Sequence, residues 1–203
     1  MAIEGTAAYE AYAADSELPP LVRAAVESAR ASGFGHSCLP EHGELLRVLA
    51  RGVGPGVIGE TGTGGGVGLA WLASAAHPGA RLVSVELDQA RATRAAGLFH
   101  EEPRVEIVHG DWKRLKEYGP FDLLALDGGG QGKGSDPAIE PAEWLRPGGL
   151  VVMDDFAPLT SYPPKFQGEI DAVRRYWFEH PQLRATQIRV TPEWSALLAV
   201  YVG

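Results

Sequence analysis

The sequence predicts an α/β fold, a doubly wound, Rossmann-like sheet of seven mostly parallel strands with an antiparallel last strand and helices on both faces. One observation is that apolar runs alternate with helix-length segments from Gly56 onward, as they do in strand–helix–strand units. A second is the glycine cluster of residues 62–66, which follows the first apolar run. A third is that only the four residues 191–194 separate the last two runs. Because so short a connection cannot hold a crossover helix, those two strands should pair antiparallel.

The segment before the sheet is expected to be helical. One helix is predicted over residues 19–32, because paired prolines suit its start and a glycine follows its end. A second is predicted over residues 40–52, where three leucines share one face. We treat residues 1–203 as one domain, in which residues 1–50 supply N-terminal helices that could act as a lid and residues 51–203 form the α/β core.

The elements of the core follow one another at regular intervals. Each expected strand is a short run rich in valine, isoleucine and leucine, and each expected helix is bounded by residues that start or stop helices. Asp88, for example, suits an N-cap. The expected strands are residues 56–60, 81–87, 105–110, 121–127, 150–155, 185–190 and 195–202. The expected helical segments are residues 67–76, 88–100, 111–119, 136–145 and 169–180, with a proline-rich loop at residues 157–165.

Composition and charge restrict the function classes. The 203 residues are 45% hydrophobic and 22% charged, as in a globular protein that buries a full core. A net charge of −8 with scattered basic residues argues against a nucleic-acid partner, since phosphate binding needs a dense positive stripe. A single cysteine, Cys38, excludes an internal disulfide and a multi-cysteine metal site. No apolar run could span a bilayer and no signal peptide is recognisable, so we expect a cytoplasmic protein without a membrane partner.

The glycine cluster suits three cofactor classes: nicotinamide dinucleotides, nucleoside triphosphates and S-adenosylmethionine. Its glycines let the backbone turn sharply and approach a ligand, and the following helix offers unpaired N–H groups. A dinucleotide fingerprint would need a glycine where Val67 stands, and a P-loop would need a lysine that the cluster lacks. The cluster instead has the pattern Glu-x-Gly-x-Gly-x-Gly. The candidate cofactor-binding residues in it are Glu60, Gly62, Thr63, Gly64 and Gly66.

The next two strands also end in candidate ligand-binding residues, and parallel sheets bind ligands at these ends. Glu86 closes the second strand, and its carboxylate can accept both ribose hydroxyls of a nicotinamide or an adenosyl cofactor. Leu87 follows it and is counted with the same cofactor site. The third strand ends at Gly110, Asp111 and Trp112, which are included as cofactor-binding candidates.

With this loop and these strand ends, the chain resembles the class I S-adenosylmethionine-dependent methyltransferases. In that family the glycine loop packs under the methionine portion of the cofactor. The resemblance implies that Asp111 reaches the adenine amino group and that a neighbouring side chain lies against the ring. Trp112 is the candidate for that stacking, with an indole that covers the sheet edge as an equal alternative.

Three carboxylates follow the fourth and fifth strands: Asp127, Asp154 and Asp155. They would repel one another unless protonated or bridged by a cation, and oxygen ligands favour Mg²⁺, with Ca²⁺ or Mn²⁺ as alternatives. The resemblance narrows here to the metal-dependent O-methyltransferases of the catechol and caffeoyl-CoA type, whose ligands lie at these strand ends as Asp and then Asp-Asn. Asp155 stands where Asn is expected. The alternative is that Asp127 contacts cofactor or backbone while the other two cap the following loop.

One position departs from that family. Its members commonly carry a lysine, serving as the base, three residues after the first metal-binding Asp, and that position is Gly130 here. Lys133 lies on the same glycine-rich loop and is the candidate substitute. The predicted catalytic residues are therefore Asp127 and Lys133.

The predicted function is methyl transfer from S-adenosylmethionine to the hydroxyl of a small-molecule substrate, with a divalent metal lowering the hydroxyl pKa if one is bound. A nicotinamide-dependent oxidoreductase is one alternative, which would need the glycine loop to accept a pyrophosphate. A non-catalytic S-adenosylmethionine-binding module is the other, suggested by the missing lysine. The sequence identifies neither the methyl acceptor nor the oligomeric state, for which a homodimer stays open.

Overall fold

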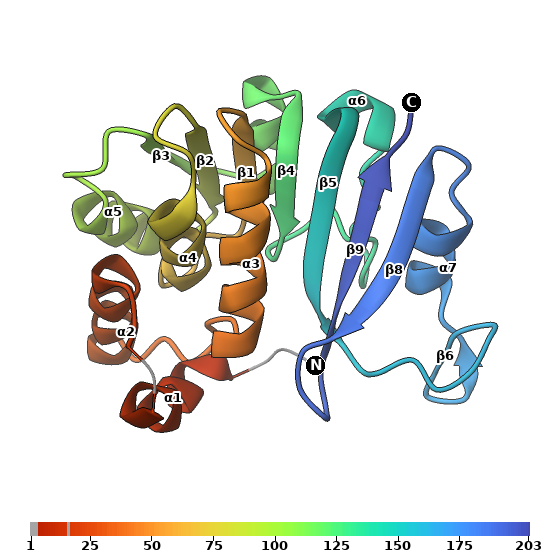
Figure 1. Cartoon of the computed structure of the whole chain (residues 1–203), viewed down its shortest axis with the longest axis horizontal. Helices are drawn as coiled ribbons and strands as arrows, with labels where there is room; N and C mark the ends of the chain where they lie inside the picture. The colour runs from red at the N-terminus through yellow and green to blue at the C-terminus, as the bar shows by residue number, and fades with distance from the viewer. Residues whose placement is uncertain (1–3, 16) are drawn as a thin grey trace.

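The computed structural model describes residues 4–15 and 17–203 and contains the predicted seven-stranded sheet, in the order β3-β2-β1-β4-β5-β9-β8 (Figure 1). Neighbouring strands from β3 to β5 pair in parallel, whereas β9 is antiparallel to both β5 and β8. The predicted fold class, with its antiparallel last strand, is confirmed. The strands are β1 Val57–Thr61, β2 Arg81–Glu86, β3 Val105–His109, β4 Phe121–Leu126, β5 Leu145–Phe156, β8 Leu183–Arg189 and β9 Ser195–Tyr201.

Helices cover both faces of the sheet, and each face has its own core. Successive strand residues point to opposite faces, so on β4 Leu123 packs into one cluster and Leu124 into the other. The first cluster includes residues of α2, α3 and α4, and the second includes Trp177 of α7. Within the part described, no helix is long and apolar enough to cross a membrane. The helices are α1 Tyr9–Asp15, α2 Pro20–Ala31, α3 Pro40–Gly52, α4 Val67–Ala75, α5 Gln89–Leu98, α6 Pro141–Trp144 and α7 Ala172–Glu179, with 3₁₀ turns at Gly5–Ala8 and Trp112–Tyr118.

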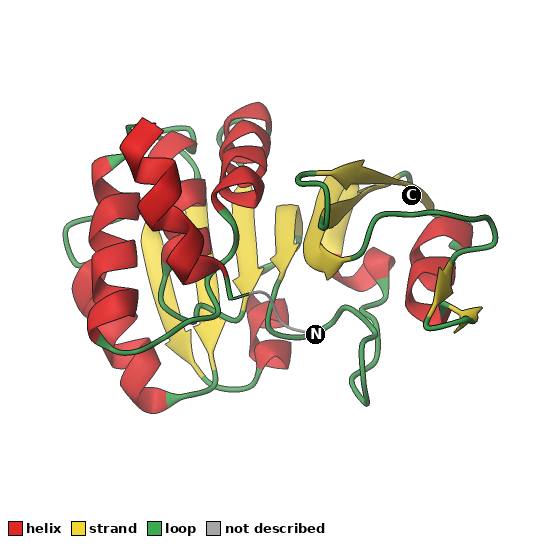
Figure 2. Cartoon of the chain, turned by 90° about the horizontal axis from the view of Figure 1, so that it is seen from below, coloured by secondary structure: helices red, strands yellow, loops and turns green. Residues whose placement is uncertain are grey.

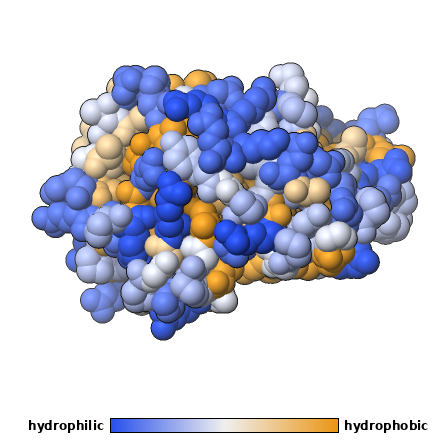
Figure 3. All heavy atoms as spheres, turned by 90° about the horizontal axis from the view of Figure 1, so that it is seen from above, coloured by the Kyte–Doolittle hydropathy of each residue, from blue (hydrophilic) through white to orange (hydrophobic). Residues whose placement is uncertain are grey.

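The strand order reverses between β1 and β4, because β2 and β3 lie on one side of β1 while the remaining strands lie on the other. Ligands of doubly wound sheets bind in the crevice at such a reversal, outside the carboxyl ends of the strands. Figure 2 looks onto these ends and the loops that leave them. The opposite end of the molecule is mainly hydrophilic, with apolar areas that are small and scattered (Figure 3).

Two expected helices are shorter than the sequence predicts. The segment 136–145 forms only the single turn α6, with Pro141 at its start. The segment 169–180 becomes helical only at Ala172, because Asp171 accepts the N–H of Arg174 as an N-cap. The residues before Asp171 instead form a small hairpin, which starts at the end of the expected loop and continues into the first residues of the expected helix. Its strands are β6 Lys165–Phe166 and β7 Glu169–Ile170.

Candidate active site

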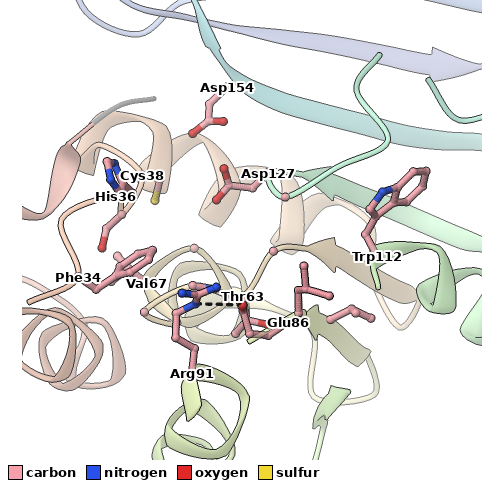
Figure 4. A pocket seen from close by; sticks show the side chains of 18 of the residues that line it. Phe34, His36, Cys38, Thr63, Val67, Glu86, Arg91, Trp112, Asp127 and Asp154 are labelled. Atoms are coloured by element: carbon pink, nitrogen blue, oxygen red, sulfur yellow. Dashed lines mark hydrogen bonds and ion pairs between the residues drawn. The ribbon is translucent and has the colours of Figure 1, made fainter. Parts of the chain in front are cut away.

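A cavity of about 450 Å³ lies at the carboxyl ends of the parallel strands (Figure 4). Its wall consists of the carboxyl ends of the parallel strands and the loops that follow them, the first turns of α4 and α5, and the segment between α2 and α3. Of the predicted site residues, all of which the structure describes, Glu60, Gly66 and Lys133 lie outside this wall. The others line it: Gly62, Thr63, Gly64, Glu86, Leu87, Gly110, Asp111, Trp112, Asp127, Asp154 and Asp155.

The glycine loop is shaped by close contacts that exclude side chains. Gly62 has a φ of +83°, and a Cβ there would lie 2.5 Å from Cα of Gly128, just after β4. Gly64 has a φ of +53°, and its Cβ would lie 2.8 Å from the ring of Phe34. Gly66 does not line the cavity and serves as the left-handed N-cap of α4. The loop is thus held between the end of β4 and the segment between α2 and α3.

Glu86 lies at the end of β2 with both carboxylate oxygens bonded (Figure 4). Its Oε2 accepts the N–H of Gly64 at 2.8 Å. Its Oε1 accepts the N–H of Asp88 at 2.9 Å and the guanidinium of Arg91 at 2.7 Å. Arg91 also lies over the ring of Phe34, 5.9 Å from its centroid. These bonds fix the orientation of the Glu86 carboxylate in the cavity wall.

Asp111 and Trp112 follow β3 and differ in what holds them. Asp111 Oδ1 accepts the N–H of Lys113 at 2.9 Å, which caps the short 3₁₀ helix. The Trp112 indole packs on Trp144, with ring centroids 5.7 Å apart. A Cβ on Gly129 would lie 2.4 Å from the Trp112 ring, so the indole also covers the loop after β4. Trp112 therefore has a packing role in addition to its place in the cavity wall.

Asp127 and Asp154 face each other at the end of the cavity beside β5 (Figure 4). Asp127 is exposed within the cavity, whereas Asp154 is buried. Desolvation by the surrounding protein raises the pKa of Asp127 well above its ordinary value, and the negative charge of the neighbouring Asp154 adds to this rise. Burial also raises the pKa of Asp154, although the positive charge of Lys133 opposes the shift. Two neighbouring carboxyl groups repel each other when both are charged, so a proton on one of them stabilises the pair.

Asp155, the third predicted metal ligand, lies on a bulge of β5. The pairing of β5 with β9 shifts between Met153 and Phe156, and Asp155 has a φ of +62°. Aspartate is among the few residues that adopt this left-handed conformation. Across residues 4–15 and 17–203, no group of three His, Cys, Asp or Glu side chains is arranged to hold a metal ion. The structure therefore brings Asp127 and Asp154 together without Asp155 as a third ligand.

Lys133, the predicted substitute base, is held beside the two carboxyl groups and not in the cavity wall. Its Nζ donates to the main-chain oxygen of Asp154 at 2.9 Å and to that of Asp155 at 3.4 Å. The ammonium also lies over the ring of Phe156, 4.3 Å from the centroid. Burial lowers the pKa of Lys133, and the negative charges of the nearby aspartates oppose this shift.

Glu60 supports the glycine loop from inside the protein. It is 2% exposed and lines a separate internal cavity of about 10 Å³. Ser84 Oγ donates to Glu60 Oε2 at 2.5 Å, and burial raises the pKa of Glu60 to about 8. Burial lowers the pKa of His42, in the same cavity, to about 4. Among the described side chains, His42 Nδ1 and Asp154 Oδ1 are buried polar atoms without a hydrogen-bond partner, and a polar cavity of this size suits one water molecule.

The raised pKa of Glu60 predicts a loss of stability with rising pH. Since the folded protein keeps this carboxyl protonated up to about pH 8, stability falls as the pH rises from the ordinary value of 4.5 to about 8. Glu60→Gln mimics the protonated form and lacks this loss. Urea unfolding should show that, between pH 4.5 and pH 8, the unfolding free energy of the variant rises by roughly 4 kcal/mol relative to that of the wild type. A difference in unfolding free energy that does not change with pH would contradict the assignment.

Sequence reasoning missed one wall of the cavity. Residues 34–38, between α2 and α3, line it together with Arg91 of α5. A signal for Arg91 was present, because Asp88 is the N-cap of α5 and accepts the N–H of Arg91. The first turn of a helix that follows a strand lies at the carboxyl end of that strand. Phe34, His36, Ser37 and Cys38 lie far from the glycine loop in the sequence, and folding places them against it.

Known proteins share this fold and are similar to this chain in sequence. A family model described as a methyltransferase domain matches residues 60–156. The curated "Putative O-methyltransferase" of Mycobacterium sp. (strain JLS) is 30% identical over 188 residues, which cover 85% of this chain and 80% of that protein. The crystal structure of the O-methyltransferase TomG from Streptomyces achromogenes, in complex with SAM, matches with a TM-score of 0.71 at 23% identity, over 98% of this chain and 97% of that one.

A further match is local. The ribosomal RNA small subunit methyltransferase A of Geobacter metallireducens (strain ATCC 53774 / DSM 7210 / GS-15) is 50% identical over 54 residues, which are 27% of this chain and only 18% of that enzyme. So short a segment gives no information about the substrate of this chain. The mycobacterial relative, in contrast, matches along most of both chains. The predicted resemblance to methyltransferases is confirmed, and the chain belongs to the O-methyltransferase family.

Proposed function

We propose that the protein binds S-adenosylmethionine in the cavity of about 450 Å³ and transfers its methyl group to an oxygen of a small molecule. The observation that carries the proposal is that a single cavity joins the glycine loop and Glu86 to Asp127. A cofactor on the glycine loop would present its methyl group to an acceptor beside Asp127. The crystal structure of TomG in complex with SAM has the same fold, which supports the same cofactor here.

The adenosyl part of the cofactor is assigned to the ends of β2 and β3. Glu86 Oε1 already accepts the N–H of Asp88 and two N–H groups of Arg91, whereas Oε2 accepts only the N–H of Gly64 and keeps a lone pair that can accept a ribose hydroxyl. Asp111 bonds Lys113 through Oδ1 only, so Oδ2 can accept the adenine amino group. Leu87 is 68% exposed and lines the cavity, which gives the base an apolar surface.

Methyl transfer needs little covalent help from the protein, so positioning dominates. The acceptor oxygen bonds to the methyl carbon in line with the breaking carbon–sulfur bond, whose electron pair remains on sulfur. The products are the methyl ether and S-adenosylhomocysteine. The hydroxyl proton of the acceptor passes to the ionised form of Asp127, which faces the cavity and acts as general base, and its raised pKa makes this carboxylate a stronger base. Asp154 faces Asp127 at the end of the cavity, and its negative charge adds to the raised pKa of Asp127.

The Mg²⁺ ion that the resemblance implies does not fit the residues present. Only Asp127 and Asp154 of its predicted ligands lie together, and the described residues contain no group of three such ligands. The ammonium of Lys133 is already hydrogen-bonded beside Asp154. The proposed mechanism therefore has no metal-dependent step.

The N-terminal helices are part of the same proposal. Residues 34–38 form one side of the cavity, which supports residues 1–50 as a cover over the cofactor and residues 51–203 as the core beneath it. Residues 1–3 and 16 of this proposed cover lie outside the described part of the chain.

Calorimetric titration with S-adenosylhomocysteine tests the proposed cofactor. We expect micromolar binding of this ligand and no binding of NADH. Glu86→Gln should weaken the binding by about tenfold, because it removes charged hydrogen bonds to the ribose and to Arg91. Glu106→Gln is the matched control, since Glu106 forms an exposed ion pair with Arg81 at 2.8 Å. Binding of NADH without binding of S-adenosylhomocysteine would favour an oxidoreductase instead.

A further inference from the structure

The ammonium group of Lys133 makes direct contacts with uncharged groups. Its Nζ donates to the main-chain oxygens of Asp154, at 2.9 Å, and Asp155, at 3.4 Å. Its third contact is the ring face of Phe156, 4.3 Å from the centroid, which is within the range of cation–π attraction. All three partners are uncharged groups, so the positive charge of Lys133 acts on the nearby carboxylates of Asp155, Asp154 and Asp127.

The loop after β4 positions Lys133 beside Asp154. Gln131 anchors the loop, because its side-chain Nε2 donates to the main-chain oxygen of Leu126. The main-chain oxygen of Gln131 accepts the indole N–H of Trp177 at 2.9 Å. These bonds tie the loop both to β4 and to α7, two residues before Lys133.

Position 130 has no room for a lysine. Gly130 has a φ of +81°, and a Cβ there would lie 2.8 Å from Cγ2 of Ile139 and 3.1 Å from the ring of Trp112. A side chain at this position would require both strained backbone and displaced neighbours. The loop therefore supplies its cation from position 133 instead.

A second cation nearby is already paired. Arg174 lies over the ring of Phe156, with Cζ 5.0 Å from the centroid. Its guanidinium forms an ion pair with Asp171 at 2.7 Å and donates to the main-chain oxygen of Ala157. Because Asp171 balances the charge of Arg174, Lys133 supplies the positive charge that acts on the carboxyl groups of Asp127 and Asp154.

We infer that Lys133 is the resident cation of the Asp127–Asp154 pair and replaces a divalent metal ion there. The inference rests on the proposed function, in which this pair serves the acceptor oxygen. The ammonium stabilises negative charge on the two carboxyl groups, and it repels a second cation from the same place. Removing its charge should therefore open the pair to a metal ion.

The test is Mn²⁺ binding to the whole chain, followed through the paramagnetic resonance signal of free Mn²⁺. The Lys133→Met variant is expected to gain a Mn²⁺ site whose affinity exceeds that of the wild type by about tenfold or more. Lys133→Arg keeps the charge and should behave like the wild type. Lys165→Met removes an exposed lysine on β6 and is the matched control. Adding Asp154→Asn to Lys133→Met should abolish the gained site.

Two results would overturn the inference. One is wild-type protein that binds Mn²⁺ as tightly as Lys133→Met, and the other is natively folded Lys133→Met that gains no site. Lys133→Gln replaces the Met variant, with the same criteria, if circular dichroism shows that Lys133→Met does not fold. Titration of the same samples with S-adenosylhomocysteine separates the two proposals. Wild-type protein that does not bind S-adenosylhomocysteine contradicts the proposed function. Wild-type protein that does bind it, with equal Mn²⁺ affinity in the wild type and Lys133→Met, contradicts only the role of Lys133.

Discussion

Asp127→Asn is expected to lower kcat for methyl transfer by about two to four orders of magnitude, because the amide cannot take the proton of the acceptor hydroxyl. Asn has nearly the same size as Asp, so the cavity should keep its shape. The affinity for S-adenosylhomocysteine should therefore stay within about threefold of the wild type. The measurement is turnover with the best acceptor from a panel of phenols and vicinal diols, together with calorimetry for the product.

Asp136→Asn is the matched control for this experiment. Asp136 is an exposed acid on the same loop as Lys133, so its replacement should leave turnover unchanged. An Asp127→Asn variant with wild-type kcat would show that another group accepts the proton. Equal losses in both variants would point to a disturbed loop and would remove the evidence for a specific base.

Gly62→Ala is expected to lower the free energy of unfolding by roughly 2–4 kcal/mol and to abolish detectable binding of S-adenosylhomocysteine. The alanine would hold a φ of +83° and place its Cβ 2.5 Å from Cα of Gly128. Since that neighbour is backbone, relief requires the ends of β1 and β4 to separate, and the cavity lies between these ends. Urea unfolding and calorimetry measure the two effects.

Gly134→Ala isolates the conformational part of this effect. Gly134 also has a left-handed backbone, with a φ of +64°, but a Cβ there meets nothing within 4 Å. Its replacement should cost only about 1 kcal/mol and leave cofactor binding intact. Equal destabilisation by the two substitutions would mean that the contact between Gly62 and Gly128 contributes little.

The strands were predictable from sequence because each is a short apolar run, and burial on both faces of a parallel sheet demands such runs. The α3 helix, Pro40–Gly52, was predictable to the residue, since proline suits its first turn. The hairpin of β6 and β7 was not predictable. Its two-residue strands carry no periodicity, so a pattern over several residues cannot reveal them.

The candidate site was predictable to the extent that it depends on strand ends. Asp127, Glu86 and Asp111 follow the ends of parallel strands, and topology alone brings such residues to one edge. Glu60 shows the limit of this rule. It lies on β1 itself, where side chains alternate between faces, and its side chain enters the interior instead of the cavity.

The sequence by itself determined the sheet, the antiparallel last strand and the edge at which the candidate site lies, because local periodicity and connection length encode these features. Only the tertiary structure decided which charges meet there. Gly130 excludes a side chain because Ile139 and Trp112 pack against it, and Lys133 reaches Asp154 because Gln131 anchors its loop. Contacts between residues far apart in the chain set these positions, and a run of glycines leaves the backbone too free to specify them locally.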